Sequence, residues 1–142
     1  MGALKRILVP LDFTPKNEEA MRLTEQLATP GETKVVLLHV VESLAHTEDQ
    51  SLADFYTRLV ANARQALEPY AARLRDAGIE VDTAVVVDRP ARRIVSEACV
   101  QGADLVIVSS HPLGQSAGPT ERWATVSYQV ALFCRRPVLL VK

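Results

Sequence analysis

The chain has 142 residues, of which 48% are hydrophobic and 23% are charged. These proportions are those of an ordinary globular domain, and they argue against a disordered or fibrous protein. The 16 basic and 17 acidic residues give a net charge of −1, which provides no electrostatic attraction for nucleic acid or an anionic membrane. No apolar run approaches the roughly 18 residues that a membrane-spanning helix needs.

The N-terminal segment and the cysteines indicate the cellular compartment. The sequence MGALKRILVPLDF passes directly from two basic residues into a strand-like segment. It lacks the apolar region and the cleavage site of a signal peptide, so we expect a cytoplasmic protein. Cys99 and Cys134 lie within helical patterns, which predicts that both are buried, reduced thiols.

Short runs of aliphatic and β-branched residues predict five strands. The run KVVLLHVV is apolar throughout apart from its histidine, which is typical of a strand covered on both faces. The predicted strands cover residues 6–10, 34–41, 81–87, 105–109 and 137–141.

Between these runs, apolar residues recur at intervals of three and four, which predicts helices. A TPG turn follows the first helix, and Gly78 and Gly102 are placed to end the second and third. Pro90 can start the third helix, because its φ is already that of a helix. The predicted helices cover residues 17–27, about 52–74, 90 to just before 102, and about 125–135.

Strands and helices alternate along the whole chain, which predicts right-handed β–α–β crossovers. The fold class is therefore α/β, with a doubly wound five-stranded parallel sheet and helices on both faces. We find no internal repeat and no linker, so we expect residues 1–142 to form a single domain. Periodicity does not choose between the strand orders 3-2-1-4-5 and 2-1-3-4-5.

Ligands of doubly wound sheets collect beyond the carboxyl ends of the strands, so the residues there are candidates for a site. Asp12 comes directly after the first strand. Its carboxylate could accept hydrogen bonds from a ribose or help to hold a metal ion. Alternatively it forms the turn and satisfies free amides before the next helix, which is the interpretation that residue type alone favours.

The three histidines differ in their surroundings. His39 lies in an apolar strand and is expected to be a hydrogen-bonded core residue, whereas His46 lies in a polar loop with no partner pattern. His111 follows the fourth strand, near the expected position of Asp12. A Ser-His-Asp hydrolase is disfavoured, because no G-x-S-x-G turn and no oxyanion donor accompany these residues.

The sequence also lacks the common metal and phosphate motifs. It contains no C-x-x-C, no H-E-x-x-H, no Walker loop and no dinucleotide-binding glycine fingerprint. An anion could still be held at the start of the last predicted helix, where free amides near Thr125 meet the helix dipole.

Several segments together resemble the universal stress protein family over essentially the whole chain. They are ILVPLDF near the start, LLHVV in the second strand, P-A-x-x-I opening the third helix, GADLVIV entering the fourth strand and PVLLV at the end. The resemblance implies the strand order 3-2-1-4-5 and a cytoplasmic role in stress survival. It also implies a homodimer that pairs the last strands of two subunits, from Pro137 to Val141.

ATP-binding members of this family carry the motif G-x2-G-x9-G-[ST] after the fourth strand. On this chain the three glycines fall on Ser109, Pro112 and Ala124, and the hydroxyl residue on Thr125. The spacer of residues 113–123 has eleven residues instead of nine, and residues 110–121 contain no Lys or Arg. Pro112 removes an amide donor from the expected phosphate cradle, because proline has no N–H.

The resemblance leaves two functions open. The first is a dimeric stress-response protein that does not depend on tight ATP binding, and the alternative is a nucleotide-binding switch with a remodelled phosphate loop. We expect no enzymatic turnover, no metal site, no cofactor beyond weakly bound ATP with Mg²⁺, and neither nucleic acid nor a membrane as partner. For any bound nucleotide we expect these residues at the site: Pro10, Asp12, Val40, Ser109, His111, Gly114 and Thr125.

Overall fold

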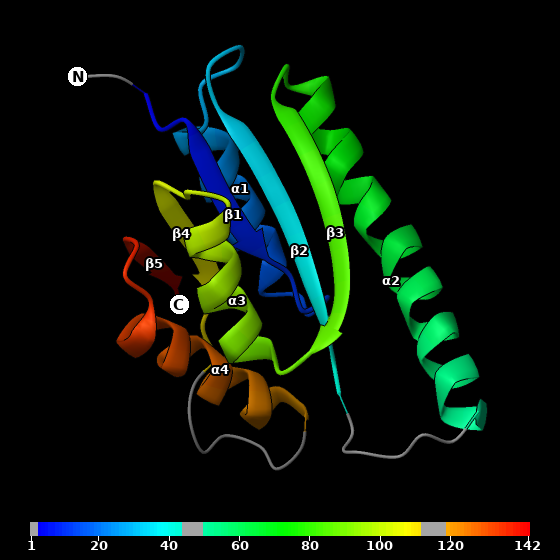
Figure 1. Cartoon of the computed structure of the whole chain (residues 1–142). Helices are drawn as coiled ribbons and strands as arrows, with labels where there is room; N and C mark the ends of the chain where they lie inside the picture. Colours follow the sequence, from blue (N-terminus) through cyan, green and yellow to red (C-terminus); the bar gives the residue numbers. More distant parts are fainter. Residues whose placement is uncertain (1–2, 44–49, 112–118) are drawn as a thin grey trace.

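The computed structural model describes residues 3–43, 50–111 and 119–142, and side chains within residues 3–43, 52–111 and 126–142. Its strands form a parallel sheet in the order β3-β2-β1-β4-β5, which confirms the doubly wound fold and decides between the two open strand orders (Figure 1). The elements are β1 (Arg6–Pro10), α1 (Asn17–Leu27), β2 (Lys34–Glu42), α2 (Gln50–Asp76), β3 (Glu80–Asp88), α3 (Pro90–Val100), β4 (Leu105–Ser109), α4 (Pro119–Phe133) and β5 (Val138–Val141).

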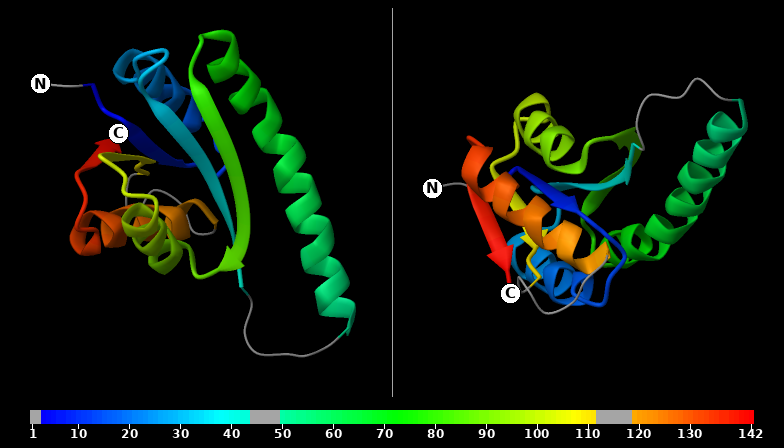
Figure 2. Two further views of the ribbon diagram at one scale, coloured as in Figure 1. Left: turned by 45° about the horizontal axis from the view of Figure 1, so that its top comes forward. Right: turned by 90° about the horizontal axis from the view of Figure 1, so that it is seen from below.

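Two apolar clusters fill the two faces of the sheet. Successive residues of a strand point to opposite faces, so Ile7 and Val9 of β1 join one cluster and Leu8 joins the other. Helices α1 and α2 cover the first cluster, and α3 and α4 cover the second. Figure 1 shows α3 and α4 in front of the sheet and α1 behind it, and Figure 2 gives the same layers from two further directions. The central strand β1 is therefore buried on both sides.

Glycines end the second and third helices at the predicted places. Gly78 has a φ of +79° and Gly102 a φ of +63°, a left-handed conformation that glycine adopts without steric cost. After Gly78, the amide of Ile79 donates to the carbonyl of Leu74 at 3.0 Å, which satisfies one of the last carbonyls of α2. Within the described residues, no helix combines the length and apolar character that crossing a membrane requires.

Helix α4 begins earlier than predicted, at Pro119 instead of near Thr125. The prediction followed apolar periodicity, but the first turn of α4 is polar (PTER) and carries the proline that commonly opens helices. Strands β1 and β4 and helix α1 have the predicted bounds. Helix α2 and strands β2 and β3 are one or two residues longer than predicted at their ends, and α4 and β5 are slightly shorter at the C-terminus of α4 and the N-terminus of β5.

The predicted burial of the two cysteines is wrong. Cys99 is exposed and Cys134 is half-buried, and neither forms a disulfide. In α3 the buried residues are Ile94 and Ala98, which are four positions apart. Cys99 follows Ala98 directly, so its side chain is turned about 100° away from the buried stripe.

Candidate functional site

The loop between β1 and α1 is held in shape by two of its own side chains. Asn17, the first residue of α1, is fully buried, and its Oδ1 accepts the amide hydrogens of Asp12 (3.1 Å) and Phe13 (2.7 Å). The Oδ1 atom of Asp12 accepts hydrogen bonds from the amide (3.0 Å) and hydroxyl (2.7 Å) of Thr14. Phe13 has a φ of +63°, which bulky residues rarely adopt. These hydrogen bonds hold a loop conformation that Phe13 alone would disfavour.

Two side-chain bridges connect this loop to the end of β4. His111 Nε2 lies 2.8 Å from Asp12 Oδ2, and each of the two side chains is only 4% exposed. Because an ionised carboxylate only accepts hydrogen bonds, His111 carries a proton on Nε2 and donates it to Asp12. Asn17 Nδ2 donates to Ser109 Oγ at 3.0 Å. The carboxyl ends of β1 and β4 are thus joined through side chains.

These bridges lie where β1 and β4 separate. The two strands pair at Ile7↔Leu105 and Leu8↔Val106, whereas β1 pairs with β2 along its whole length. The strand order reverses between β1 and β4, so their carboxyl ends flank the position where doubly wound sheets bind ligands. We name this position the switch crevice, and it is bordered by Asp12, Thr14, Asn17, Ser109 and His111.

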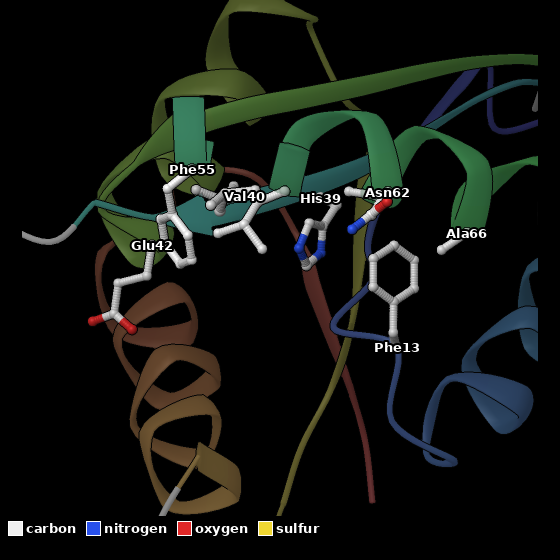
Figure 3. Close-up of a pocket in the computed structure, with 10 residues that line it drawn as sticks. Phe13, His39, Val40, Glu42, Phe55, Asn62 and Ala66 are labelled. Atoms are coloured by element: carbon white, nitrogen blue, oxygen red, sulfur yellow. The ribbon is translucent and has the colours of Figure 1, made fainter. Parts of the chain in front are cut away.

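An open apolar cleft of about 480 Å³ lies beside the same loop, between the end of β2 and helix α2. Figure 3 shows the rings of Phe13 and Phe55 toward its two ends, with Val40 and His39 between them. None of the described residues that line it is Lys or Arg. We name it the α2 cleft, and it is lined by Phe13, His39, Val40, Val41, Glu42, Phe55, Leu59, Asn62, Ala63 and Ala66.

His39 forms part of the wall of the α2 cleft. Its Nδ1 donates to the carbonyl oxygen of Leu11 at 2.7 Å, and its ring stacks on Phe13 with 4.4 Å between centroids. Burial lowers the pKa of His39, and this effect outweighs the opposing effects of the Leu11 carbonyl and the Asp12 carboxylate. The imidazole is therefore neutral at pH 7 and offers the cleft a flat, uncharged surface.

The structure brings the candidate residues at the ends of β1 and β4 together. His111 contacts Asp12, as its position after the fourth strand suggested. The turn-forming interpretation of Asp12 is confirmed, because its carboxylate accepts the amide of Thr14. His39 has the predicted hydrogen-bond partner, but it is half-buried and lines a cleft instead of lying in the core.

The other candidates lie apart from the switch crevice or outside the described residues. Pro10 is buried at the end of β1, and Val40 is 2% exposed and lines the α2 cleft. The predicted anion site at the amide of Thr125 is wrong, because Thr125 lies inside α4, where amides bond within the helix. Three further predictions concern residues that the structure does not describe: His46, Pro112 and Gly114.

Sequence reasoning missed Asn17 and the α2 cleft. Asn17 opens α1, but its side chain accepts amides of the preceding loop instead of capping the helix, so its residue type alone gives no signal for this role. The α2 cleft follows from the different lengths of helix α2 and strand β2. Helix α2 has 27 residues and β2 has nine, which correspond to about 40 Å and 30 Å. The helix is therefore longer than the strand beneath it, and some apolar residues of its first turns line a cleft instead of the core.

A comparison with models of known protein families shows to which family this chain belongs. The model of the universal stress protein family matches residues 3–142. The chain belongs to the universal stress protein family. This universal stress protein is 26% identical to universal stress protein MJ0577 of Methanocaldococcus jannaschii, over 97% of this chain and 94% of that relative. The solved structure of MJ0577 has a TM-score of 0.81 and 28% identity, over 99% of this chain and 97% of that one.

Two more distant structures share the fold. Universal stress protein UspA from Lactobacillus plantarum has a TM-score of 0.84 at 18% identity, over 100% of both chains. A universal stress protein family protein from Arabidopsis thaliana, with AMP bound, has a TM-score of 0.70 at 18% identity, over 97% of this chain and 91% of that one. Family membership identifies this chain as a stress-response protein.

Proposed function

We propose that this universal stress protein acts in the cytoplasm as a single-domain homodimer that pairs its β5 strands and does not depend on tight ATP binding. The observation that carries the proposal is the edge of the sheet at β5. Strand β5 pairs with β4 on one side, from Val106↔Val138 to Ser109↔Val141, and within the described chain no strand covers its other side. Uncovered strand edges tend to pair with another chain.

Exposed apolar side chains on the helix that precedes β5 support self-association. Three large residues on the last two turns of α4, the helix that leads into β5, are unusually exposed: Tyr128 (43%), Leu132 (76%) and Phe133 (68%). Grouped apolar residues of this kind are typical of protein–protein contacts.

Sedimentation velocity tests the dimer. We expect the native chain to sediment as a dimer at micromolar concentration and Leu139→Lys, within β5, to sediment as a monomer. Val100→Lys is the matched control, because Val100 is a 76% exposed apolar residue at the end of α3 and belongs to neither α4 nor β5. A native chain that is monomeric at these concentrations, or a Leu139→Lys variant that stays dimeric, would contradict the proposal.

The expected weakness toward ATP is supported by the chemistry of the site. Both oxygens of the Asp12 carboxylate already accept hydrogen bonds from the chain itself. None of the described residues that line the α2 cleft is a cation, and Pro112 has no N–H for a phosphate. Loss of one or two charge-assisted hydrogen bonds, at about 1.5–3 kcal/mol each, weakens a micromolar site toward the millimolar range.

The second candidate function is binding of a nucleoside monophosphate, and the α2 cleft favours it. Its apolar walls and flanking aromatic rings suit a flat heterocycle, and Val40, one of the candidate nucleotide residues, is part of the wall. The Arabidopsis relative has AMP bound. Calorimetric titration with AMP and with ATP plus Mg²⁺ separates the two candidates. We expect ATP to bind no more tightly than AMP, and low-micromolar ATP binding that Asp12→Ala abolishes would overturn the first proposal.

We propose no enzymatic turnover for this chain. The hydrogen bonds of His111 and Asp12 form a closed network with Thr14, and the Ser109 hydroxyl is bonded to Asn17 instead of facing a base. Steady release of phosphate from ATP by the pure protein, lost in Asp12→Ala, would show that this is wrong.

A further inference from the structure

The Asp12 carboxylate is inaccessible in this structure. It accepts three hydrogen bonds, two from Thr14 and one from His111, and its side chain is 4% exposed. A carboxylate offers about four acceptor positions, so a fourth hydrogen bond is chemically available but sterically closed. A ligand hydroxyl that bonds Asp12 must first displace one of its present partners.

The two partners differ in how easily they can leave. Thr14 is two residues from Asp12, and both of its bonds belong to one tight turn. His111 is 99 residues away along the chain. His111 comes directly after Ser110. The Ser110 amide donates to the Val141 carbonyl, which is the last backbone hydrogen bond described between β4 and β5. The imidazole can therefore turn away from Asp12 without breaking any strand pairing.

The departure of His111 would also open the switch crevice. Among the described residues β1 and β4 pair no further than Leu8 and Val106, and the Asp12–His111 contact links the segments that follow the two strands. The second bridge, from Asn17 to Ser109, is buried to a similar degree, because Asn17 is 0% and Ser109 is 5% exposed. The Asp12–His111 bridge thus covers the Asp12 carboxylate, and the Asn17–Ser109 bridge still joins the start of α1 to the end of β4 when the first bridge is broken.

We infer that His111 is a latch, which holds the switch crevice closed over Asp12 and must release it before a nucleoside hydroxyl can bind there. The inference rests on the second candidate function above, the binding of a nucleoside monophosphate. The latch lowers the apparent affinity for such a ligand by the fraction of molecules that are open. Removing the imidazole should therefore tighten binding, although it removes a native hydrogen bond.

The experiment measures AMP affinity by calorimetry and thermal stability in the full chain and three variants. His111→Ala removes the latch, and we expect its Kd for AMP to fall by about three- to tenfold while its melting temperature also falls. His111→Gln keeps an N–H near the position of Nε2 and should behave like the native chain. Thr14→Val removes a hydrogen bond from the same carboxylate but leaves the latch, so it should lose stability without any gain in affinity.

Hydrogen exchange of the Asp12, Phe13 and Thr14 amides gives a readout that needs no ligand. We expect faster exchange in His111→Ala and native rates in His111→Gln. If AMP binds to none of the four proteins, the proposed binding of a nucleoside monophosphate fails. In that case, amide exchange in His111→Ala at the same rates as in the native chain would refute the latch as well. If AMP binds to the native chain, an unchanged or weaker affinity of His111→Ala would overturn the latch and leave the candidate function intact.

Discussion

The switch crevice and the α2 cleft share one loop but are built in opposite ways. The crevice is closed by polar side chains that bond to one another, whereas the cleft is open and mostly apolar. Consecutive residues divide between them: the carboxylate of Asp12 lies in the crevice, and the ring of Phe13 lies in the cleft. The left-handed backbone of Phe13 therefore has a structural role, because it lets one short loop contribute to both regions.

The largest effect is expected for Asn17→Ala, which should disrupt both regions together. The variant leaves the amides of Asp12 and Phe13 without their acceptor and breaks the bridge to Ser109. Each buried hydrogen bond lost in this way costs about 1–3 kcal/mol, so we expect the free energy of unfolding to fall by about 3 kcal/mol. Urea denaturation measures it. Asn62→Ala, which removes an exposed amide beside the α2 cleft, is the control and should change stability by less than about 0.5 kcal/mol.

Phe13→Ala should affect the cleft and spare the crevice. Loss of the half-buried ring and of its stacking on His39 should cost about 2 kcal/mol in urea denaturation. The NMR signals of the His111 ring should keep their native positions, because the Asp12 contact does not involve the Phe13 side chain. A shift of the His111 signals as large as that of His39 would show that the two regions are not independent.

Phe13→Gly tests the backbone alone. Glycine adopts a φ of +63° without the steric cost that alanine meets. We therefore expect Phe13→Gly to be more stable than Phe13→Ala by about 0.5–1 kcal/mol, the reverse of the usual order at an ordinary loop position. Equal stability of the two variants would mean that the loop relaxes to a negative φ when the ring is removed.

The smallest effect is a pH dependence that originates in the α2 cleft. Burial lowers the pKa of His39 in the folded state, whereas the unfolded chain keeps a pKa of about 6.5. Below about pH 6.5 the unfolded state takes up a proton that the folded state resists, so this contribution to stability is complete above that pH and is lost as the pH falls further. His39→Asn, which keeps a donor for the Leu11 carbonyl, should lose less stability between pH 7.5 and 5.5 than the native chain. Equal losses in the two proteins would contradict this explanation.

Much of the fold could be predicted from the sequence because its signals are local. Aliphatic runs defined all five strands, and glycines defined the ends of α2 and α3. The strand order came from the family resemblance, since periodicity describes each element but not its neighbours. The start of α4 was missed because a polar first turn carries no apolar periodicity, and the burial of Cys99 was mispredicted because one residue step along a helix changes the face.

The candidate site was less predictable because it depends on relations between distant residues. The ends of β1 and β4 were expected to converge, and Asp12 and His111 do. No sequence pattern indicated that Asn17 would hold two loop amides and a serine of another strand. The α2 cleft depends on the relative lengths of a helix and a strand, which a residue-by-residue reading does not compare.

The central place of β1 has a consequence for synthesis of the chain. Strand β1 gains its first neighbour when residues 34–42 emerge, but its second neighbour, β4, begins only at residue 105. At a translation rate of about 5–20 residues per second, the β4-facing edge of β1 therefore waits for several seconds without a partner. An apolar strand with one open edge is prone to pair with other chains. A chaperone that binds the nascent chain would therefore be needed most during this interval, before residues 105–109 have left the ribosome.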